Sequence, residues 1–577
     1  MSDAVEKARA FLREERAFRL GPLLTESSHP KTRRLSQTIQ ADVAAGIRQL
    51  LSVDEDIAAA ADRLFAQDGY NRLIDAFLGA MNAGRRIFFT GCGATGRLSI
   101  LLEAAWRRFW HEMKPLAPEA AQMWPLCISV MAGGDFALIK SVEGFEDFTD
   151  FGRHQLREAG VQAGDVVVAI TEGGETPFVI GTAWEGLDRG AEVFFVYNNP
   201  TTLLAEHVER SRQVIEEPRI VKLDLTTGPM AVMGSTRMQA TTAELLVVGA
   251  ALETAVVRWL QDRRPQLARQ VRTPAEYARL YQKLQSDLSA PEAVDTLCRV
   301  TQFEEAIYRK HGLVTYVADS LLLDVLTDTT ERSPTFMVPP FRKDGDTHSP
   351  VSWAFVKDPH RPTEQAWERM LQRPPRGLRW KPETYRQLNA PPRIQANPPR
   401  LDNAEIHRFR IGNEPDPSRT EAMDSAMVAV GLCDEVKWAH SAPMRFGKTA
   451  AITIGPNQGP IDVDEHFQFA CELPASPLRL WEHLAIKLVL NTVSTATMVR
   501  LGRVVGNAMV WLSPSNKKLI DRGTRLISQV TGCSYEHACE ILHQTIEDVA
   551  SIAQRGEEAP SPVALAIERV SAEESHP

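Results

Sequence analysis

Glycine and threonine residues gather in two short segments whose spacing suits the binding of a phosphate group. The first, Gly91-Cys-Gly-Ala-Thr-Gly-Arg97, follows an apolar run and precedes a long helical pattern. A strand that enters such a turn at the start of a helix points free backbone N–H groups and the helix dipole at an anion. The second segment is Thr171-Glu-Gly-Gly-Glu-Thr-Pro177. We predict that phosphate is bound by Gly91, Gly93, Thr95, Gly96, Arg97 and Thr171.

Two other chemistries are less favoured. The glycines of the first segment also fit the dinucleotide pattern G-x-G-x-x-G, but this pattern alone is weak evidence for a nicotinamide cofactor. A tight strand-to-helix turn without any ligand is a further interpretation. His537, Cys539 and His543 have a spacing that metal ligands can have, yet no other ligand group is near in sequence. We expect no cofactor and no metal.

The elements around these segments follow a β-α-β order. Apolar runs, each followed by a small-residue loop and a helical stretch, occur at 86–90, 165–170, 193–197 and 220–225. Their continuous apolarity predicts strands buried on both faces of a parallel sheet. A second, weaker copy begins near Cys298, with expected strands at 312–318, 406–411, 426–431 and 451–454. The fold class is therefore α/β, with two parallel sheets flanked by helices and a helical region at the C-terminus.

Composition excludes several classes of partner. The 577 residues carry 65 basic and 74 acidic side chains, a net charge of −9, so an excess of positive charge for nucleic acid is lacking. Seven scattered cysteines, an odd number, favour a reducing compartment over a disulfide framework. The N-terminus has no apolar signal region, and no window is expected to reach the length of a membrane span. We expect a cytoplasmic protein without nucleic-acid or membrane partners.

Several strings, taken in order, resemble one known family. The chain is similar to the sugar isomerase (SIS) domains of N-acetylmuramic acid 6-phosphate etherases and of the glucokinase regulatory protein. The resemblance covers about residues 22 to 545 and is carried by the glycine-rich turn and by Leu24-Thr-Glu26, Ala132-Gly-Gly134, Val142-Glu-Gly-Phe-Glu-Asp147, Thr176-Pro-Phe-Val179, Gly234-Ser-Thr-Arg-Met238 and Lys487-Leu-Val-Leu-Asn491.

The layout differs from that of an etherase, which has one SIS domain in each chain. Here a long additional stretch separates the Gly-Ser-Thr-Arg-Met string from the Lys-Leu-Val-Leu-Asn string, as in the two-domain glucokinase regulatory protein. We expect a helical arm at 1–60, a first SIS domain at 61–270, a second at 271–512 with a Pro-rich insertion at 361–401, and a helical module with a tail at 513–577. Because the fused pair already forms the usual SIS interface, a monomer is expected.

The family's functional residues are divided between the two halves. The resemblance implies catalytic carboxylates at Glu146 in the first half and Glu331 in the second, where Asp328-Thr-Thr-Glu-Arg-Ser-Pro-Thr-Phe336 matches the etherase string. The family lysine matches Lys487. We predict one composite pocket between the halves, with Ser235, Thr236, Arg237 and Lys487 added to the phosphate loops. The second loop departs from etherases, with Gly173 in place of a serine and with Glu172 and Glu175 added.

The resemblance implies three functions. The favoured one is a sugar-phosphate-sensing regulator similar to the glucokinase regulatory protein, with a sugar kinase as its partner. The alternative is a lyase similar to N-acetylmuramic acid 6-phosphate etherase, in which one glutamate removes the proton at C2 and another protonates the leaving lactyl oxygen. The third is an aldose–ketose isomerase. The resemblance does not decide whether the protein is an enzyme, since carboxylates can also bind sugar hydroxyls.

Overall fold

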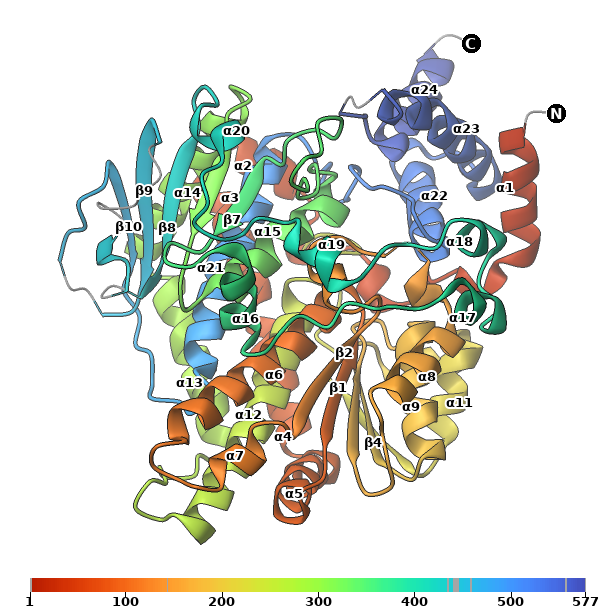
Figure 1. The fold of residues 1–577 in the computed structure, drawn as a ribbon. Coiled ribbons are helices and arrows are strands. Elements are labelled where there is room, and N and C mark those ends of the chain that lie inside the picture. Colours follow the sequence, from red (N-terminus) through yellow and green to blue (C-terminus); the bar gives the residue numbers. More distant parts are fainter. Residues whose placement is uncertain are drawn as a thin grey trace.

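Two parallel sheets form the framework of the molecule. The computed structural model describes residues 3–142, 144–432, 435–438, 446–456, 459–555 and 558–575 (Figure 1). The first sheet consists of β1 Ile87–Gly91, β2 Cys127–Met131, β3 Val166–Ile170, β4 Glu192–Tyr197 and β5 Ile220–Asp224. The second consists of β6 Val314–Val317, β7 Ala354–Lys357, β8 Ala426–Leu432, β9 Lys448–Ile454 and β10 Glu465–Phe469.

Both sheets have the same strand order. The first is β2-β1-β3-β4-β5 and the second is β7-β6-β8-β9-β10, and the strands paired in each sheet are parallel. This is a doubly wound order, whose ligand crevice lies where neighbouring crossovers leave in opposite directions. In the first sheet that point is at the carboxyl ends of β1 and β3, which are followed by the two glycine-rich segments.

Helices cover the sheets and join the two units. The N-terminal arm and the first unit contain α1 Asp3–Glu14, α2 Leu35–Ala41, α3 Val43–Val53, α4 Glu55–Phe65, α5 Asp68–Ala83, α6 Gly93–Met113, α7 Ala120–Met123, α8 Thr149–Glu158, α9 Pro177–Asp188, α10 Thr201–His207, α11 Glu209–Glu216 and α12 Gln239–Arg263. The second unit contains α13 Pro274–Leu288, α14 Pro291–Tyr308, α15 Leu322–Phe336, α16 Thr363–Leu371, α17 Pro382–Gln387, α18 Pro392–Ala396, α19 Asn403–His407, α20 Pro417–Thr420 and α21 Leu480–Arg500. The short 3-10 turns η4 Asp135–Leu138 and η5 Phe145–Asp147 follow β2.

The interface between the units is made by helices that are apolar on all sides. Nearly all residues of α12 and α21 are buried, and these helices contact each other, while α6 contacts α15. A helix without a polar face belongs to an interior. Within the described residues, α12 is the one helix long and apolar enough to cross a membrane, and its apolar window is completely buried in the fold. The expectation that no window reaches such a length is thus wrong for α12, which is a core helix.

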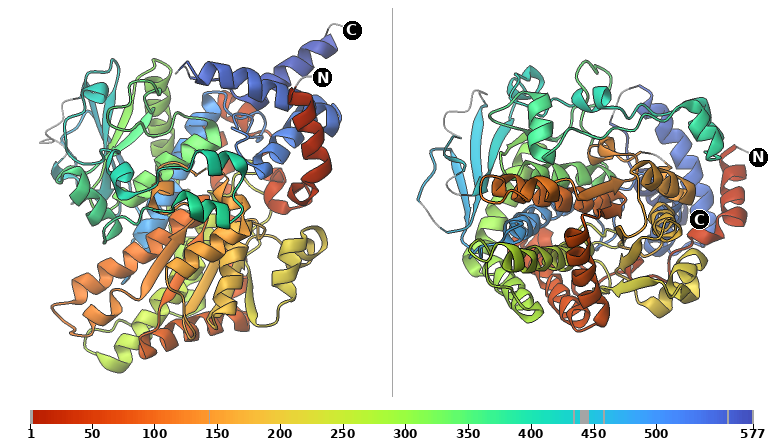
Figure 2. Two further views of the ribbon diagram at one scale, coloured as in Figure 1. Left: turned by 45° about the vertical axis from the view of Figure 1, so that its right-hand side comes forward. Right: turned by 60° about the horizontal axis from the view of Figure 1, so that its bottom comes forward.

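The C-terminal helices α22 Lys517–Thr531, α23 Tyr535–Ala553 and α24 Pro562–Ser575 form the predicted helical module. They pack against one another, and α1 from the opposite end of the chain lies along α23, as both views of Figure 2 show. Residues 372–401, which follow α16, cross the face of the first unit and carry α17 and α18 (Figure 1). We call this segment the strap.

The predicted α/β class and the parallel sheets are confirmed. The strand expected at 406–411 is wrong, because α19 and a loop occupy that stretch. Its apolar residues Ile406, Phe409 and Ile411 are buried without joining a sheet. Strands β2, β7 and β10 have no counterpart among the expected strands, since polar residues interrupt β2 and β10 and the apolar run of β7 is short.

The close packing of α8 on α9 depends on Gly152 and Gly181, because a Cβ atom on Gly181 would lie 2.0 Å from the carbonyl oxygen of Thr149. A Cβ atom on Gly152 would lie 1.9 Å from the carbonyl oxygen of Phe178, so Gly152→Ala should destabilise the fold by about 3 kcal/mol through overpacking. Gly79 on α5 is the matched control, because a Cβ there meets nothing within 4 Å and Gly79→Ala should stabilise the helix by roughly 1 kcal/mol. Thermal unfolding of both variants checks this prediction. Equal melting temperatures for the two would contradict the packing.

Candidate functional site

The turn between β1 and α6 is shaped by residues that do not themselves line a cavity. A Cβ atom on Gly91 would lie 2.5 Å from the carbonyl carbon of Thr95, and one on Gly96 would lie 2.5 Å from a side chain of β2. The Thr95 hydroxyl closes the turn, because it accepts from the Cys92 amide (3.1 Å) and donates to the Cys92 carbonyl (2.9 Å). By contrast, Gly93, with φ of 53°, lines the cavity in front of the turn.

A cavity of about 900 Å³ opens at the carboxyl ends of β1 and β3. Its walls come from both units and from the start of α22, and they include Gly93, Arg97, Glu146, Glu172, Ser235, Thr236, Arg237, Glu331, Pro334, Asn516, Lys518 and Arg522. We call this space the inter-unit cavity. A neighbouring space of about 1100 Å³ shares Gly93, Glu146 and Asn516 with it. The fold thus brings Glu146 and Glu331, which are 185 positions apart, to one cavity.

Glu331 lies on α15 and is buried, and one of its carboxylate oxygens accepts no hydrogen bond. Its Oε2 has no hydrogen-bond partner and lies 4.0 Å from Nη1 of Arg237. Burial raises the pKa of Glu331, and the nearby charges of Lys487 and Arg97 oppose this rise. Arg97 itself donates to the Thr330 hydroxyl (3.2 Å), one residue before Glu331. The raised pKa makes the protonated form of this carboxyl more accessible than that of an exposed glutamate.

Glu146 lies on η5 and is half-buried. It accepts a hydrogen bond from the side-chain amide of Asn516, whose own oxygen caps α22 by accepting from the Leu519 amide (2.8 Å). Burial raises the pKa of Glu146, while the charges of Lys518 and Arg522 lower it. Asn516 therefore couples the position of Glu146 to the first turn of the C-terminal module.

The loop after β3 contributes one carboxylate to the cavity and holds another away from it. Glu175 pairs with Arg210 (2.6 Å) and Lys518 (2.7 Å), so its charge is compensated. Glu172 lines the inter-unit cavity, and burial raises its pKa to about 7. Thr171, predicted to bind the ligand, is instead buried, and its hydroxyl lies 3.0 Å from that of Thr176.

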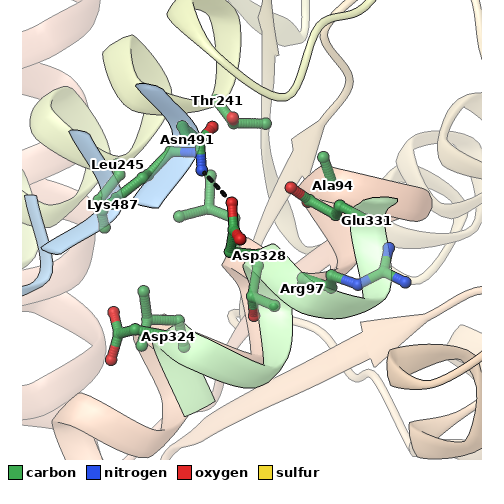
Figure 3. A pocket seen from close by; sticks show the side chains of 12 residues that line it. Ala94, Arg97, Thr241, Leu245, Asp324, Asp328, Glu331, Lys487 and Asn491 are labelled. Atoms are coloured by element: carbon green, nitrogen blue, oxygen red, sulfur yellow. Dashed lines mark hydrogen bonds between the residues drawn. The ribbon is translucent and has the colours of Figure 1, made fainter. Parts of the chain in front are cut away.

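Arg237 and Lys487 are engaged in contacts between the units. Arg237 reaches Oδ1 of Asp328 (3.2 Å) and the hydroxyl of Ser494 (2.6 Å), and its carbonyl accepts from Lys487 Nζ (2.7 Å). Lys487 lines a smaller cavity of about 440 Å³ rather than the inter-unit cavity. Figure 3 shows it there beside Leu245, opposite Glu331 and Arg97, which line both spaces. Lys487 therefore lies on the far side of Glu331 from Glu146.

Two cations of the site, Lys518 and Arg522, were not predicted from the sequence. Arg522 forms two hydrogen bonds to Glu26 in the N-terminal arm (2.9 and 2.6 Å), and a Cβ on Gly234 would lie only 2.5 Å from its Nε. Lys518, Arg522 and Arg525 recur at i, i+4 and i+7 on α22. This spacing on one helix face was the signal that could have identified them.

The strap fixes η5 from the outside. Trp380 stacks on Phe145, the residue before Glu146, with ring centroids 5.6 Å apart and an angle of 19° between the rings. Two arginines anchor the strap: Arg373 pairs with Asp135, and Arg376 Nη2 lies 2.7 Å from Oε1 of the buried Glu103. The predicted Pro-rich insertion thus packs against the unit that carries the cavity.

Comparisons with known proteins show which families the chain resembles. Residues 71–185 match the family model described as the glucokinase regulatory protein N-terminal SIS domain. An N-acetylmuramic acid 6-phosphate etherase of Synechococcus sp. is 32% identical over 241 residues, which are 41% of this chain and 67% of the etherase. N-acetylmuramic acid 6-phosphate etherase 1 of Bacillus licheniformis is 28% identical over 242 residues, 41% of this chain and 70% of that protein.

The chain belongs to the family of SIS-domain proteins that includes these etherases. The stretch matched by the family model contains the turn after β1, Glu146 and Glu172. Among solved structures, the C-terminal domain of glucosamine-fructose-6-phosphate aminotransferase from Francisella tularensis aligns with 79% of this SIS-domain protein and 96% of its own chain, at 10% identity and a TM-score of 0.45.

Glu172 should make the stability of the protein depend on pH. The unfolded chain releases this proton near pH 4.5, whereas the folded chain releases it near pH 7, so stability falls as the pH rises between these values. At pH 8 the folded protein must hold the Glu172 carboxylate ionised in a buried place, which lowers the free energy of unfolding by on the order of 3 kcal/mol, and Glu172→Gln removes this cost. We expect this variant to have a higher melting temperature than the wild type at pH 8 and the same melting temperature at pH 4.

Glu175→Gln is the matched control for Glu172→Gln. Burial raises the pKa of Glu175, but its pairs with Lys518 and Arg210 outweigh burial and lower the pKa overall. This substitution should therefore lower the melting temperature at pH 8. The same direction of change in both variants would contradict the assigned surroundings of the two carboxylates.

Trp380→Ala should loosen the turn that carries Glu146, because the ring that covers Phe145 is lost. Hydrogen exchange of backbone amides in residues 144–151 should become faster, with little change in the β-sheets. Trp124→Ala, whose ring lies beside Arg107 on another part of the first unit, is the control. Unchanged exchange at 144–151 in Trp380→Ala would show that the strap does not hold η5.

Proposed function

We propose that this protein binds a sugar phosphate in the inter-unit cavity and cleaves a lactyl ether, as an etherase-type lyase. The observation that carries the proposal is the pair Glu146 and Glu331, which line the same cavity from two units. Burial raises the pKa of both carboxyls. The similarity to N-acetylmuramic acid 6-phosphate etherases supports the substrate class.

The phosphate would be held where α6 begins. The first N–H groups of a helix bind anions, and α6 begins at Gly93 on the cavity wall. Hydroxyl groups of Ser235 and Thr236 and the ammonium of Lys518 line the same cavity and can donate further hydrogen bonds. The sugar ring would then extend toward Glu331.

The proposed reaction is an elimination followed by addition of water. One glutamate takes the proton from C2 of the sugar, the bond from C3 to the lactyl oxygen breaks, and the other glutamate protonates the leaving oxygen, so lactate is released at this step. Water then adds across the C2–C3 double bond of the unsaturated intermediate and gives the sugar phosphate. Either carboxylate can be the base, because burial and nearby cations act on both in the same way.

A second candidate function is a ligand-sensing regulator. It is favoured by the match of residues 71–185 to the N-terminal SIS domain of the glucokinase regulatory protein and by two SIS-like units in one chain. In that case the protein would be a monomer, and a sugar phosphate in the inter-unit cavity would change its affinity for a partner protein. We propose a sugar kinase as this partner.

Incubation with N-acetylmuramic acid 6-phosphate distinguishes the two functions. An etherase releases D-lactate, and Glu146→Gln and Glu331→Gln should each lower the rate about a hundredfold or more, as expected for loss of a general acid or base. Glu536→Gln, an exposed carboxylate on α23, is the control and should keep the wild-type rate.

Release of lactate that survives both substitutions would overturn the assigned roles. Absence of lactate, together with a rise in melting temperature with a sugar phosphate that Glu331→Gln reduces, would favour the regulator.

A further inference from the structure

A second cavity, of about 960 Å³, lies in the second unit along the edge strand β7. Phe355 and Lys357, two positions apart and thus on one face of β7, line it together with Ser352. Its other walls are the loops before β7 and before β8. It shares no lining residue with the inter-unit cavity. We call it the β7 cavity.

The β7 cavity has an excess of positive charge. Its lining contains five cations and three carboxylates: Arg342, Lys343, Lys357, Arg410 and Arg419 against Asp344, Asp346 and Asp416. Two of the cations are neutralised nearby, because Arg410 pairs with Asp344 (2.7 Å) and Lys343 pairs with Glu405. Arg342, Lys357 and Arg419 remain, against Asp346 and Asp416, which leaves an excess of one positive charge.

Two of the remaining cations are buried without a carboxylate. Arg419 is 2% exposed and donates to the Thr315 hydroxyl (2.7 Å) and to the carbonyls of Val314 and Ser352 (2.8 Å each). Lys357 is 1% exposed. Among the described residues, no carboxylate oxygen lies within 4.0 Å of either charge, and both flank Phe355, at 5.3 and 5.9 Å from its centroid.

Lys357 retains free hydrogen-bonding capacity. Its ammonium has three N–H groups and donates one hydrogen bond, to the carbonyl of Glu414 (3.1 Å). Burial lowers the pKa of Lys357, the charges of Asp416 and Glu414 oppose this, and the like charges of Arg419 and Arg410 add to the lowering. Burying such a charge is costly unless an opposite charge is supplied. Asp416 and Glu414 supply part of this opposite charge from beyond 4.0 Å, and an anion bound against the ammonium would supply the rest.

We propose that the β7 cavity is a second binding site, which takes the phosphate group of a small phosphorylated molecule. The phosphate would lie against Lys357 and Arg342, with a hydroxyl donor from Thr347 on the cavity lining. The volume exceeds that of a phosphate group, and Phe355 offers an apolar surface for the rest of the molecule. This site does not depend on the chemistry proposed for the inter-unit cavity.

Equilibrium dialysis with radiolabelled inorganic phosphate tests the proposal on the full chain. The wild type should bind phosphate at two sites, and Lys357→Met should lose one of them. Lys518→Met should lose the other. The exposed Lys381 lies outside both cavities, so Lys381→Met should retain two sites. Unchanged stoichiometry in Lys357→Met would overturn the β7 site, whereas unchanged stoichiometry in Lys518→Met would count only against phosphate binding in the inter-unit cavity.

Arg342→Gln is a second variant in case Lys357→Met does not fold. Arg342 is half-buried and donates to one carbonyl, that of Ser349 (3.4 Å), so the fold should tolerate its loss. Its substitution should weaken phosphate binding at the β7 cavity by about tenfold, the value of one charge-assisted hydrogen bond. Wild-type affinity in this variant, measured with the inter-unit site removed by Lys518→Met, would also overturn the proposal.

Discussion

The position of the candidate site depends on Asp328, a buried carboxylate through which the two units are joined. Its Oδ1 accepts from Arg237 of the first unit (3.2 Å) and from Ser494 (2.9 Å), and its Oδ2 accepts from Arg332 (2.8 Å). A buried charge of this kind is tolerated only with all its partners present. Glu331 follows three residues later, on the same face of α15, and therefore lies against the cavity of the first unit. The contact that holds the units together thus also positions the carboxylate.

The charges around the inter-unit cavity explain why several carboxylates can face one ligand. Lys518 is paired with Glu175, and Arg522 with Glu26, so these pairs compensate part of the charge, while the Lys518 ammonium keeps N–H groups for a further acceptor. Glu172 faces the cavity with a pKa of about 7. In the proposed function, an anion bound beside it would stabilise the protonated carboxyl, so binding of a phosphate would take up a proton and be strengthened at lower pH. The added carboxylate at this position would then make affinity depend on pH rather than exclude phosphate.

The two units have the same strand order but differ at the turn after β1 and the corresponding turn after β6. In the first unit, the turn after β1 is so tight that a Cβ atom on Gly91 would lie 2.5 Å from the backbone of Thr95, and glycine makes this approach possible. The corresponding turn after β6 has no glycine, and its Asp319 pairs with Arg361 (2.7 Å). The second unit contributes α15 to the cavity of the first and holds its own group of buried cations along β7.

Local sequence determined the elements and the chemistry of the first loop. Continuous apolar runs predicted β1, β3 and β4, because strands buried on both faces need such runs, and the glycine spacing predicted the turn to α6. The resemblance supplied Glu146 and Glu331. Only the tertiary structure decided that Lys487 lies behind Glu331, that Thr171 turns inward, and that α22 completes the wall. The positions of Lys487 and α22 depend on contacts between residues hundreds of positions apart. Such contacts are set by the packing of the two units and the C-terminal helices, and local sequence patterns do not encode this packing.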